Sequence, residues 1–514
     1  MTYSFNLIDK PWIPCTQING RVLEFNLRET LEKAHELRGV QGDSPLETAS
    51  LYRLLLAVLH SVLRGPADEI EWGKLWKAKR FVPETFSAYF EKWHSRFDLF
   101  DEKRPFYQIR EEQMVEKSAL LLTHGMSTAN ELFEHSMVVE TTLIRCAQAT
   151  RMLLVGQYFG LGGLVYPGMP NLTGAPLLRG VTFLIEGNNL FETLLLNCLQ
   201  YSKHKPLPTL GKDEPVWEME APFQPRDKPN GYLDYLTWQN RKVLLIPDEE
   251  NGNIVIRNMR ISKGLSLDKE LEDPFKQYSK KDKGWKYLPF TKEKSLWRDS
   301  HTLFVRNNPN EVHSPKIFDW LALLLDETDC LEAKQKYRIM ALGAGVHFKD
   351  AKIFFYRHEN MPLPLAYLAD ESLVSKLSDA SANAEQVKSL LWRATSTLAR
   401  NLISPSVDEK GGRQPDSNDV AKLMKHWGAE ANYWSALEIR FSLLVEELPL
   451  EPDAAINRWK ENLQQTAWDA LRSAERMAGG STAALKAAVK AEGVLYGELK
   501  KLFEVIQPQQ EATA

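Results

Sequence analysis

The stretch from Cys146 to Gly180 constrains this chain more than any other, because a helical pattern runs into a dense group of glycines. Apolar residues spaced three and four apart predict a helix that reaches Val155. The glycines that follow are Gly156, Gly160, Gly162, Gly163, Gly168, Gly174 and Gly180. Glycine loses much conformational entropy on folding. Such a cluster therefore indicates backbone at positive φ, or backbone held very close to another surface.

Two familiar glycine-rich loops do not fit this segment. A phosphate-binding P-loop needs a Gly-Lys-Ser/Thr triplet that opens a helix, and none follows Gly163. A dinucleotide-binding fingerprint needs a strand before its glycines, whereas here a helix precedes them and a proline-rich loop follows. On the residues alone, a tightly packed turn and a backbone surface that receives another molecule both remain open.

Composition limits the class of protein. The chain has 514 residues, 43% of them apolar, so we expect two or more domains with substantial cores. The net charge of −4 does not indicate a nucleic-acid protein, so any such surface must be local. The cysteines lie too far apart for zinc-ribbon or disulfide spacing. The chain shows no signal-peptide core and no apolar run long enough to cross a membrane, which predicts a cytoplasmic protein.

The order of expected elements predicts an α+β fold, in which a mixed domain over residues 1–364 precedes a four-helix bundle over residues 365–514. In the first part we expect strands over 5–15, 181–185 and 351–357, helices over 26–38, 46–63, 317–328 and 334–342, and a turn over 343–350. In the second part, four amphipathic stripes are separated by a polar linker, two prolines and a Gly-Gly-Ser helix stop.

The window from Arg257 to Arg298 has a local excess of positive charge. It holds 12 Lys or Arg against 6 Asp or Glu, and aromatic residues are interleaved with them. Cations that meet phosphates and aromatics that stack on bases are typical of nucleic-acid binding. A solvated charged loop on a packed aromatic base has the same composition, so both interpretations stay open.

Motifs of catalysis are missing from the sequence. It contains no His-Glu-x-x-His, no Gly-x-Ser-x-Gly and no Asp-x-Asp metal pair. The acids of Phe97–Gln108 favour a turn in which they pair with Arg104 while the aromatics pack, and His60 favours a partnered histidine rather than a ligand. We therefore predict no catalytic residue, no metal site and no cofactor.

Several stretches together resemble the large subunit of type I-E CRISPR surveillance complexes, the CasA family of Cascade. They are FNLIDKPWIPC near the N-terminus, RPFYQ at Arg104–Gln108, QYFGLGG at Gln157–Gly163, DPF at Asp273–Phe275 and WRD at Trp297–Asp299. The resemblance covers nearly the whole chain. It implies a non-catalytic subunit that reads the protospacer-adjacent motif on duplex DNA beside the 5′ handle of the CRISPR RNA. Such a subunit helps to open the duplex and recruits a separate helicase–nuclease.

The resemblance also implies site residues, carried over position by position. The glycine loop of the family matches Gly160, Leu161, Gly162 and Gly163. A backbone without side chains suits a narrow minor groove. The lysine finger matches Lys263, and Arg260 is close enough to compete for that role.

Two further loops carry over with altered residues. The wedge that inserts into DNA matches Phe348, Lys349 and Asp350, where this chain has no glutamine although the best-known wedge of the family has one. The loop that touches the RNA handle matches Phe133, Glu134 and His135. The implied partners are the CRISPR RNA, target double-stranded DNA, the other Cascade subunits and the helicase–nuclease, with no membrane.

Two functions of other classes remain as alternatives. Scattered Asp, Glu and His residues are compatible with a metal-dependent nuclease or another enzyme, because catalytic groups can come from distant positions. A scaffold subunit without any DNA contact is the second alternative.

Overall fold

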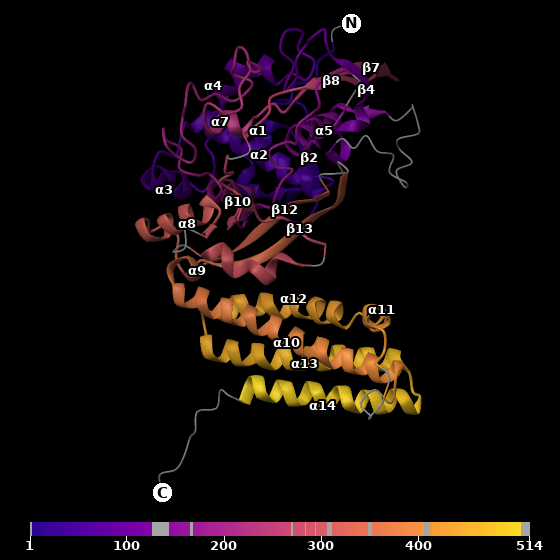
Figure 1. Ribbon diagram of the computed structural model, residues 1–514. Coiled ribbons are helices and arrows are strands. Elements are labelled where there is room, and N and C mark those ends of the chain that lie inside the picture. Colours follow the sequence, from indigo (N-terminus) through magenta and orange to yellow (C-terminus); the bar gives the residue numbers. More distant parts are fainter. Residues whose placement is uncertain are drawn as a thin grey trace. The chain divides into compact units, whose positions relative to one another are not determined.

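The computed structural model describes residues 3–125, 143–164, 168–268, 271–282, 284–292, 294–305, 311–347, 352–405, 412 and 414–504. The chain divides into two compact units (Figure 1). The N-terminal unit comprises Met1–Leu296 and Leu303–Met361, and the C-terminal unit comprises Trp297–Thr302 and Pro362–Ala514. A short segment from the middle of the chain thus belongs to the second unit.

The N-terminal unit mixes short helices with small antiparallel sheets. Its described helices are α1 (Leu27–Glu32), α2 (Pro45–Leu63), α3 (Glu69–Lys77), α4 (Pro83–Trp93), α5 (Cys146–Phe159), α6 (Leu190–Leu196), α7 (Tyr232–Leu236) and α8 (Lys316–Glu327). The first sheet has the order β2-β1-β3, from β1 (Ile13–Gln17), β2 (Val22–Phe25) and β3 (Leu37–Val40). A second has the order β10-β9-β11, from β9 (Tyr278–Lys281), β10 (Gly284–Tyr287) and β11 (Val312–His313).

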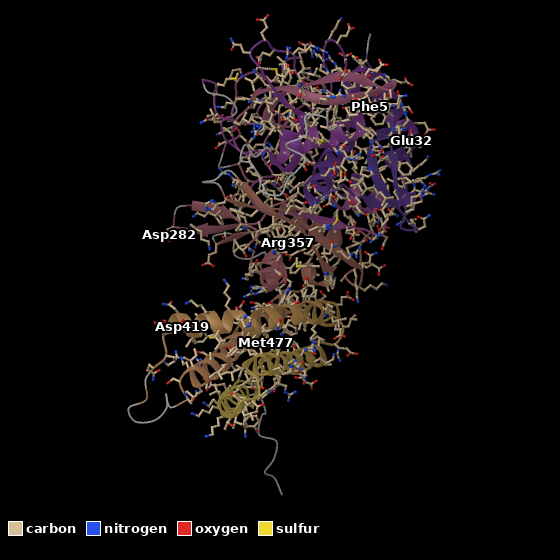
Figure 2. The ribbon with its side chains drawn as sticks, turned by 90° about the vertical axis from the view of Figure 1, so that its right-hand side faces the viewer. Phe5, Glu32, Asp282, Arg357, Asp419 and Met477 are labelled. Atoms are coloured by element: carbon tan, nitrogen blue, oxygen red, sulfur yellow. The ribbon has the colours of Figure 1, made fainter. Side chains whose placement is uncertain are left out.

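Two further sheets carry the segments that matter for function. One has the order β13-β12-β6, from β6 (Thr182–Glu186), β12 (Lys336–His347) and β13 (Lys352–Pro364). The other is built on β8 (Asn253–Lys263), which pairs with β4 (Val115–Ser118), β5 (Ile144–Arg145) and β7 (Arg241–Glu250). On β13, the Arg357 guanidinium lies 5.0 Å from the ring centre of Phe355 and 5.6 Å from that of Phe290, so this strand packs through cation–π contacts (Figure 2).

The helix α2 forms the centre of the N-terminal core. Ser44 caps it by accepting a hydrogen bond from the Glu47 amide at 3.2 Å, and Pro45 occupies its first turn. Within the described residues, α2 is long and apolar enough to cross a membrane, but 89% of its apolar window is buried inside the protein. His60 on this helix is fully buried and its Nδ1 lies 2.9 Å from the Gly65 carbonyl, which confirms a partnered histidine.

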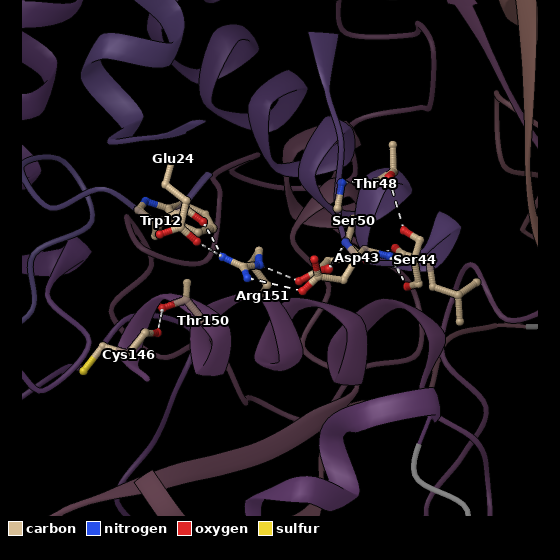
Figure 3. A network of polar contacts seen from close by, with 12 residues as sticks. Trp12, Glu24, Asp43, Ser44, Thr48, Ser50, Cys146, Thr150 and Arg151 are labelled. Carbon is tan, nitrogen blue, oxygen red and sulfur yellow. Dashed lines mark hydrogen bonds and ion pairs between the residues drawn. The ribbon is translucent and has the colours of Figure 1, made fainter. Parts of the chain in front are cut away.

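Arg151 on α5 joins three elements of this core (Figure 3). Its Nε donates to the Glu47 carboxylate at 2.6 Å, and one terminal nitrogen donates to Glu24 at 2.8 Å and to the Trp12 carbonyl at 3.0 Å. The charge is buried but paired, so it ties α5 to α2 and to the first sheet. The helix that leads into the glycine segment is thereby fixed at its middle.

The C-terminal unit is helical, which confirms the predicted order of a mixed part followed by a helical part. Four long helices lie side by side in Figure 1: α10 (Glu371–Ile403), α12 (Ala429–Glu447), α13 (Pro452–Ala478) and α14 (Thr482–Glu504). The shorter helices are α9 (Ala366–Ala369) and α11 (Ser417–Trp427). Hydrogen bonds from Trp459 to the Ala380 carbonyl and from Tyr433 to the Ala384 carbonyl, both 2.9 Å, join α13 and α12 to α10.

The predicted helix stop between α13 and α14 is confirmed. Gly479 adopts a φ of +91° directly after α13, and the Ser481 hydroxyl accepts a hydrogen bond from the Ala484 amide at 3.1 Å. The inserted segment Trp297–Thr302 also belongs to this unit. The ring of Trp297 is 4% exposed and lies 4.6 Å from that of Phe441, centre to centre.

Four predicted elements of the N-terminal unit are wrong in type or extent. The expected helix over 334–342 and residues 343–347 of the expected turn are instead part of the long strand β12, where buried side chains begin in alternation at Tyr337 and Ile339. The expected helix over 26–38 ends at Glu32, and β3 follows it. The first strand begins at Ile13 rather than at Phe5, although Trp12 is buried as predicted.

Candidate nucleic-acid interface

The glycine segment forms a tight double loop at the end of α5. The helix runs one turn beyond the predicted end, to Phe159, and Gly160 follows it in extended backbone. Gly163 and Leu172 exchange two backbone hydrogen bonds of 3.1 and 2.8 Å, and the Ala175 amide donates to the Gly160 carbonyl at 2.9 Å. Residues 160–163 therefore lie against residues 172–175 as a short antiparallel pair.

The glycines of this loop are required for different reasons. At Gly160, an added Cβ would lie 2.5 Å from the Gly156 carbonyl oxygen and 2.7 Å from the Arg241 guanidinium. At Gly162 it would lie 3.1 Å from the Leu172 carbonyl oxygen. Gly163 instead has a φ of +150°, and an added Cβ would meet no atom within 4 Å. Gly160 is therefore required because a side chain would not fit there. Gly163 is instead required by its backbone conformation, and the space where a side chain would lie is open.

Leu161 differs from its neighbours, because its side chain belongs to the core and is only 2% exposed. Gly162 and Gly163 are partly exposed, and Leu164 is 51% exposed. At Gly162 and Gly163 the surface that this loop offers is therefore backbone, and the exposed side chain of Leu164 follows it.

A buried arginine holds the loop in place. Arg241, the first residue of β7, is fully buried, and its terminal nitrogens donate to the Leu161 carbonyl at 2.6 Å and to the Thr173 carbonyl at 2.7 Å. Burial lowers the pKa of Arg241 to about 9, which leaves the guanidinium protonated at neutral pH. One side chain thus joins the two halves of the glycine double loop.

The backbone of Arg241 is tied to α5 as well. The fully buried Gln157 side chain accepts a hydrogen bond from the Arg241 amide at 2.9 Å and donates to its carbonyl at 2.8 Å. The side-chain amide of Gln157 therefore pairs with the backbone at the start of β7. Because Gln157 lies on the last turn of α5, it fixes β7 next to the glycine loop. The motif QYFGLGG carries both the loop and its anchor.

The structure brings Lys263 to the same place. Lys263 is the last residue of β8 and pairs across the hairpin with Arg241. The next residue, Gly264, lies so close to the start of β7 that an added Cβ would be 2.5 Å from the Gln239 carbonyl oxygen and 2.6 Å from the Arg241 amide. Lys263 is partly exposed and forms no ion pair within the described part of the chain. The glycine loop and Lys263 thus share one end of the β7–β8 hairpin.

Arg260 lies farther along β8, where it pairs with Leu244 of β7 and with Glu116 of β4. It is exposed, whereas the neighbouring positions 259 and 261 are buried. Because side chains alternate along a strand, Arg260 and Lys263 point to opposite faces of the sheet. The two candidates for the finger are therefore separated by the fold.

The basic window divides into structural and exposed cations. Lys276 is 4% exposed, its Nζ donates to the carbonyls of Pro176 and Arg179 at 2.8 and 2.5 Å, and burial lowers its pKa to about 8. Arg257 forms ion pairs with Asp248 and Glu250. Three aromatics of this window belong to the packed interior, Phe275 at 3%, Phe290 at 5% and Trp297 at 4% exposed, whereas Trp285 is 36% exposed.

Two predicted loops lie outside the described residues. They are the wedge at Phe348, Lys349 and Asp350, and the RNA-handle loop at Phe133, Glu134 and His135. The strands β12 and β13 lead to the wedge positions from either side.

Sequence reasoning missed Arg241 and Lys276, the two buried cations that hold the glycine segment. The signal for Arg241 is a polar group, Gln239-Asn240-Arg241, at the start of an apolar strand. The sequence signal for Lys276 is weaker, because it is only the position of this lysine after the DPF motif within a run of cations. Neither pattern alone separates a buried cation from an exposed one.

No group of three or more His, Cys, Asp or Glu side chains able to hold a metal occurs among the residues that the structure describes. The acids of Phe97–Gln108 have backbone partners, since Asp98 accepts from the Phe100 amide at 2.8 Å and Asp101 accepts from the Arg104 amide at 2.6 Å. Phe106 and Tyr107 are buried beside them, which confirms the predicted packing of the aromatics. The predicted pairing of the acids with the Arg104 side chain is wrong within the described residues, because that guanidinium donates to the Met219 carbonyl instead.

Comparison with known proteins gives a consistent result. Residues 6–470 match the family model described as CRISPR-associated protein Cse1. The CRISPR-associated protein CasA/Cse1 of Thermus thermophilus is 32% identical over 96% of this chain and 98% of its own length. The crystal structure of Thermus thermophilus CasA has a TM-score of 0.79 at 28% identity, covering 97% of this chain and all of that one.

A chain of a CRISPR RNA-guided surveillance complex has the same fold, with a TM-score of 0.74 at 21% identity over 96% of this chain and 99% of its own length. The family match, the identity and the length covered agree with the motifs of the sequence. The chain belongs to the CRISPR-associated Cse1 (CasA) family, the large subunits of type I-E Cascade.

Proposed function

We propose that this chain is the non-catalytic Cascade subunit that recognises the protospacer-adjacent motif from the minor groove of duplex DNA. The observation that carries the proposal is the shared position of the glycine loop and Lys263 at one end of the β7–β8 hairpin. Gly162 and Gly163 present backbone without side chains, and Lys263 adds a cation beside them that has no ion-pair partner within the described structure.

Minor-groove chemistry suits these groups. The groove is about 6 Å wide, so a glycine backbone enters it more easily than one with side chains. Lysine is a compact cation on a flexible stem, and the groove offers A·T and G·C patterns that are degenerate. A site built in this way discriminates weakly between sequences and accepts several related motifs rather than one.

The remaining roles follow from the family. A surveillance-complex chain shares this fold, which supports assembly of this chain with CRISPR RNA and the other Cascade subunits in the cytoplasm. We assign the RNA handle to Phe133, Glu134 and His135, and the wedge that starts duplex opening to Phe348–Asp350. Guide pairing then reads the target sequence, and the bound complex recruits the helicase–nuclease.

A pair of glycine substitutions tests the proposal. Gly163 in the glycine loop and Gly252 in the β7–β8 turn both have positive φ and open space for a Cβ. Substitution by alanine therefore costs about 1 kcal/mol of strain at each position. Motif-bearing DNA is first selected by the wild-type complex from a library randomised beside the target. We expect Gly163→Ala to lose the preference for selected over scrambled motifs, and Gly252→Ala to keep it, at similar melting temperatures.

Equal behaviour of the two variants on both DNAs would overturn this assignment of the loop and favour a scaffold subunit without DNA contact. Gly160→Ala serves as the packing control. Its added Cβ meets backbone and the buried Arg241, so we expect this variant to lower the melting temperature together with binding.

Lys263 and Arg260 are distinguished by parallel alanine variants. If Lys263 contacts a base edge, Lys263→Ala costs about 1–3 kcal/mol on selected motifs only. A cation that touches phosphate alone weakens all sequences and lowers the salt slope by about 1. We expect Lys263→Ala to weaken binding on selected motifs only. We expect Arg260→Ala at most to weaken binding on all sequences equally. The reverse result would move the finger to the other face of the sheet.

A further inference from the structure

A cavity lies beside the Arg104–Arg110 segment, and no residue of the glycine loop lines it. It has a volume of about 170 Å³ between this segment, the short helix that ends at Phe97, and residues 216–223. Its lining residues include the basic residues Arg96, Lys103, Arg104 and Arg110 and one acidic residue, Glu220. Four basic residues thus line a space large enough for a phosphate group and part of a sugar.

None of these four cations has a carboxylate partner among the described residues. Arg104 donates to the Met219 carbonyl at 2.9 Å, and Arg110 donates through Nε to the Glu102 carbonyl at 2.9 Å. Burial and the nearby charge of Arg104 lower the pKa of Arg96, so these two guanidinium groups repel each other across the cavity. The nearby carboxylates of Asp101 and Glu220 oppose this effect on Arg96, but the lining cations outnumber the lining acid. Such an excess of positive charge is stabilised when an anion binds.

The wall of the cavity is rigid. Tyr107 has a φ of +57°, a conformation that is uncommon for a bulky residue. Its hydroxyl lies 2.6 Å from that of Tyr158, and its ring is buried against Trp217, whose centre is 6.2 Å away. Strained backbone that is fixed by its surroundings is common at binding sites. Lys103, Arg104 and Arg110 therefore flank a fixed turn, whereas Arg96 lies on the short helix that ends at Phe97.

We propose that this cavity binds the phosphate monoester of a nucleotide. Three arginines offer planar donor groups that fit phosphate oxygens, and the excess of cations over the single lining acid suits a doubly charged anion better than a carboxylate. The phosphate belongs either to a free nucleotide or to the end of a nucleic-acid strand. Neither Gly163 nor Lys263 is among the residues that line the cavity.

Calorimetric titration of the isolated full-length chain tests the site. The ligands are inorganic phosphate, adenosine 5′-monophosphate, and one short oligonucleotide with and without a 5′-terminal phosphate. Arg96→Ala removes a cation that makes no hydrogen bond within the described structure, so the fold is retained. Arg80→Ala, at an exposed arginine outside the cavity, removes the same charge as a control. We expect Arg96→Ala to weaken phosphate binding about tenfold and Arg80→Ala to leave it within about twofold.

If the mononucleotide binds and Arg96→Ala weakens that binding as expected, the site is supported and its ligand is a free nucleotide. Binding confined to the 5′-phosphorylated oligonucleotide supports the site and assigns it a strand end. Equal binding of both oligonucleotides, an equal loss in the two variants, or no binding at millimolar ligand would overturn the proposal. Preference for a glutamate-rich peptide over every phosphate would also overturn it, because the cations would then serve a protein partner.

Discussion

Replacing Arg241 by methionine separates the positioning of the glycine loop from the stability of the fold. Methionine keeps much of the volume and removes every donor. Arg241→Met deletes the two hydrogen bonds to the glycine double loop, at the Leu161 and Thr173 carbonyls, which are 2.6 and 2.7 Å long, together with local contacts to the adjacent Asn240. Hydrogen bonds from a charged donor contribute about 1.5–3 kcal/mol each, so their loss costs about 3–6 kcal/mol.

The same substitution removes a buried charge. Burial lowers the pKa of Arg241 from 12.5 to about 9, and each pKa unit corresponds to about 1.4 kcal/mol, so desolvation opposes folding by about 5 kcal/mol. Folded and unfolded states both hold the proton below pH 9, so this cost is constant from pH 5 to pH 8. The free energy gained by removing the buried charge and the free energy lost with the hydrogen bonds nearly cancel. We therefore expect the free energy of unfolding to change by no more than about 2 kcal/mol.

The loop itself has no such compensation. If it loses about 3 kcal/mol of local stability, the amides that close it should exchange about a hundredfold faster. The measurement is hydrogen exchange by mass spectrometry on peptides that span residues 160–175, where the Gly163, Leu172 and Ala175 amides are bonded. Motif-dependent DNA binding by the reassembled complex should be lost in the same variant.

Arg151→Met is the matched control, since Arg151 is also buried but is paired with Glu47 and Glu24. Its removal leaves a buried carboxylate unpaired, so we expect a loss of about 3–5 kcal/mol in the free energy of unfolding. Unchanged exchange over residues 160–175 in Arg241→Met would refute the positioning role. So would a fall in stability as large as that of Arg151→Met, because the loop would then fail only with the fold.

Three other predictions concern separate parts of the chain. Burial lowers the pKa of His60 to about 4, against about 6.5 when unfolded, so the unfolded state takes up more protons as the pH falls. Denaturant unfolding should show a loss of about 2 kcal/mol between pH 7 and pH 5 that is absent from His60→Gln. Trp297→Ala removes the ring packed on Phe441 and should cost about 3–5 kcal/mol in thermal unfolding of the C-terminal unit. Purified protein with Mg²⁺ or Mn²⁺ should leave DNA uncut, and metal-dependent cleavage would favour the nuclease alternative.

The sequence predicted the elements whose apolar patterns are long and unambiguous. The stripe of α2 and those of the C-terminal helices identify amphipathic helices, because the period of 3.6 is sustained over several turns. It failed at β12, where the alternation at Tyr337 and Ile339 gives way to a continuous buried run that fits a strand or a helix equally well.

For the site, the sequence located the glycine loop and Lys263 but not the reason for their proximity. That reason is the β7–β8 register, which pairs Lys263 with Arg241 and depends on contacts between distant segments. The glycines of the loop also differ in their surroundings. Gly160 is required by packing against Arg241, whereas Gly163 leaves its side open. Composition cannot distinguish these two cases, because both positions simply read as glycine.

The most direct test of the central claim is to alter one groove of the selected motif at a time. Hypoxanthine in place of guanine removes the amino group from the minor groove, and 7-deazaguanine removes N7 from the major groove. Affinity of the reassembled complex is measured on each duplex. Minor-groove recognition by the glycine loop and Lys263 predicts a change of about tenfold or more with hypoxanthine and less than about twofold with 7-deazaguanine. Sensitivity to 7-deazaguanine alone would contradict it.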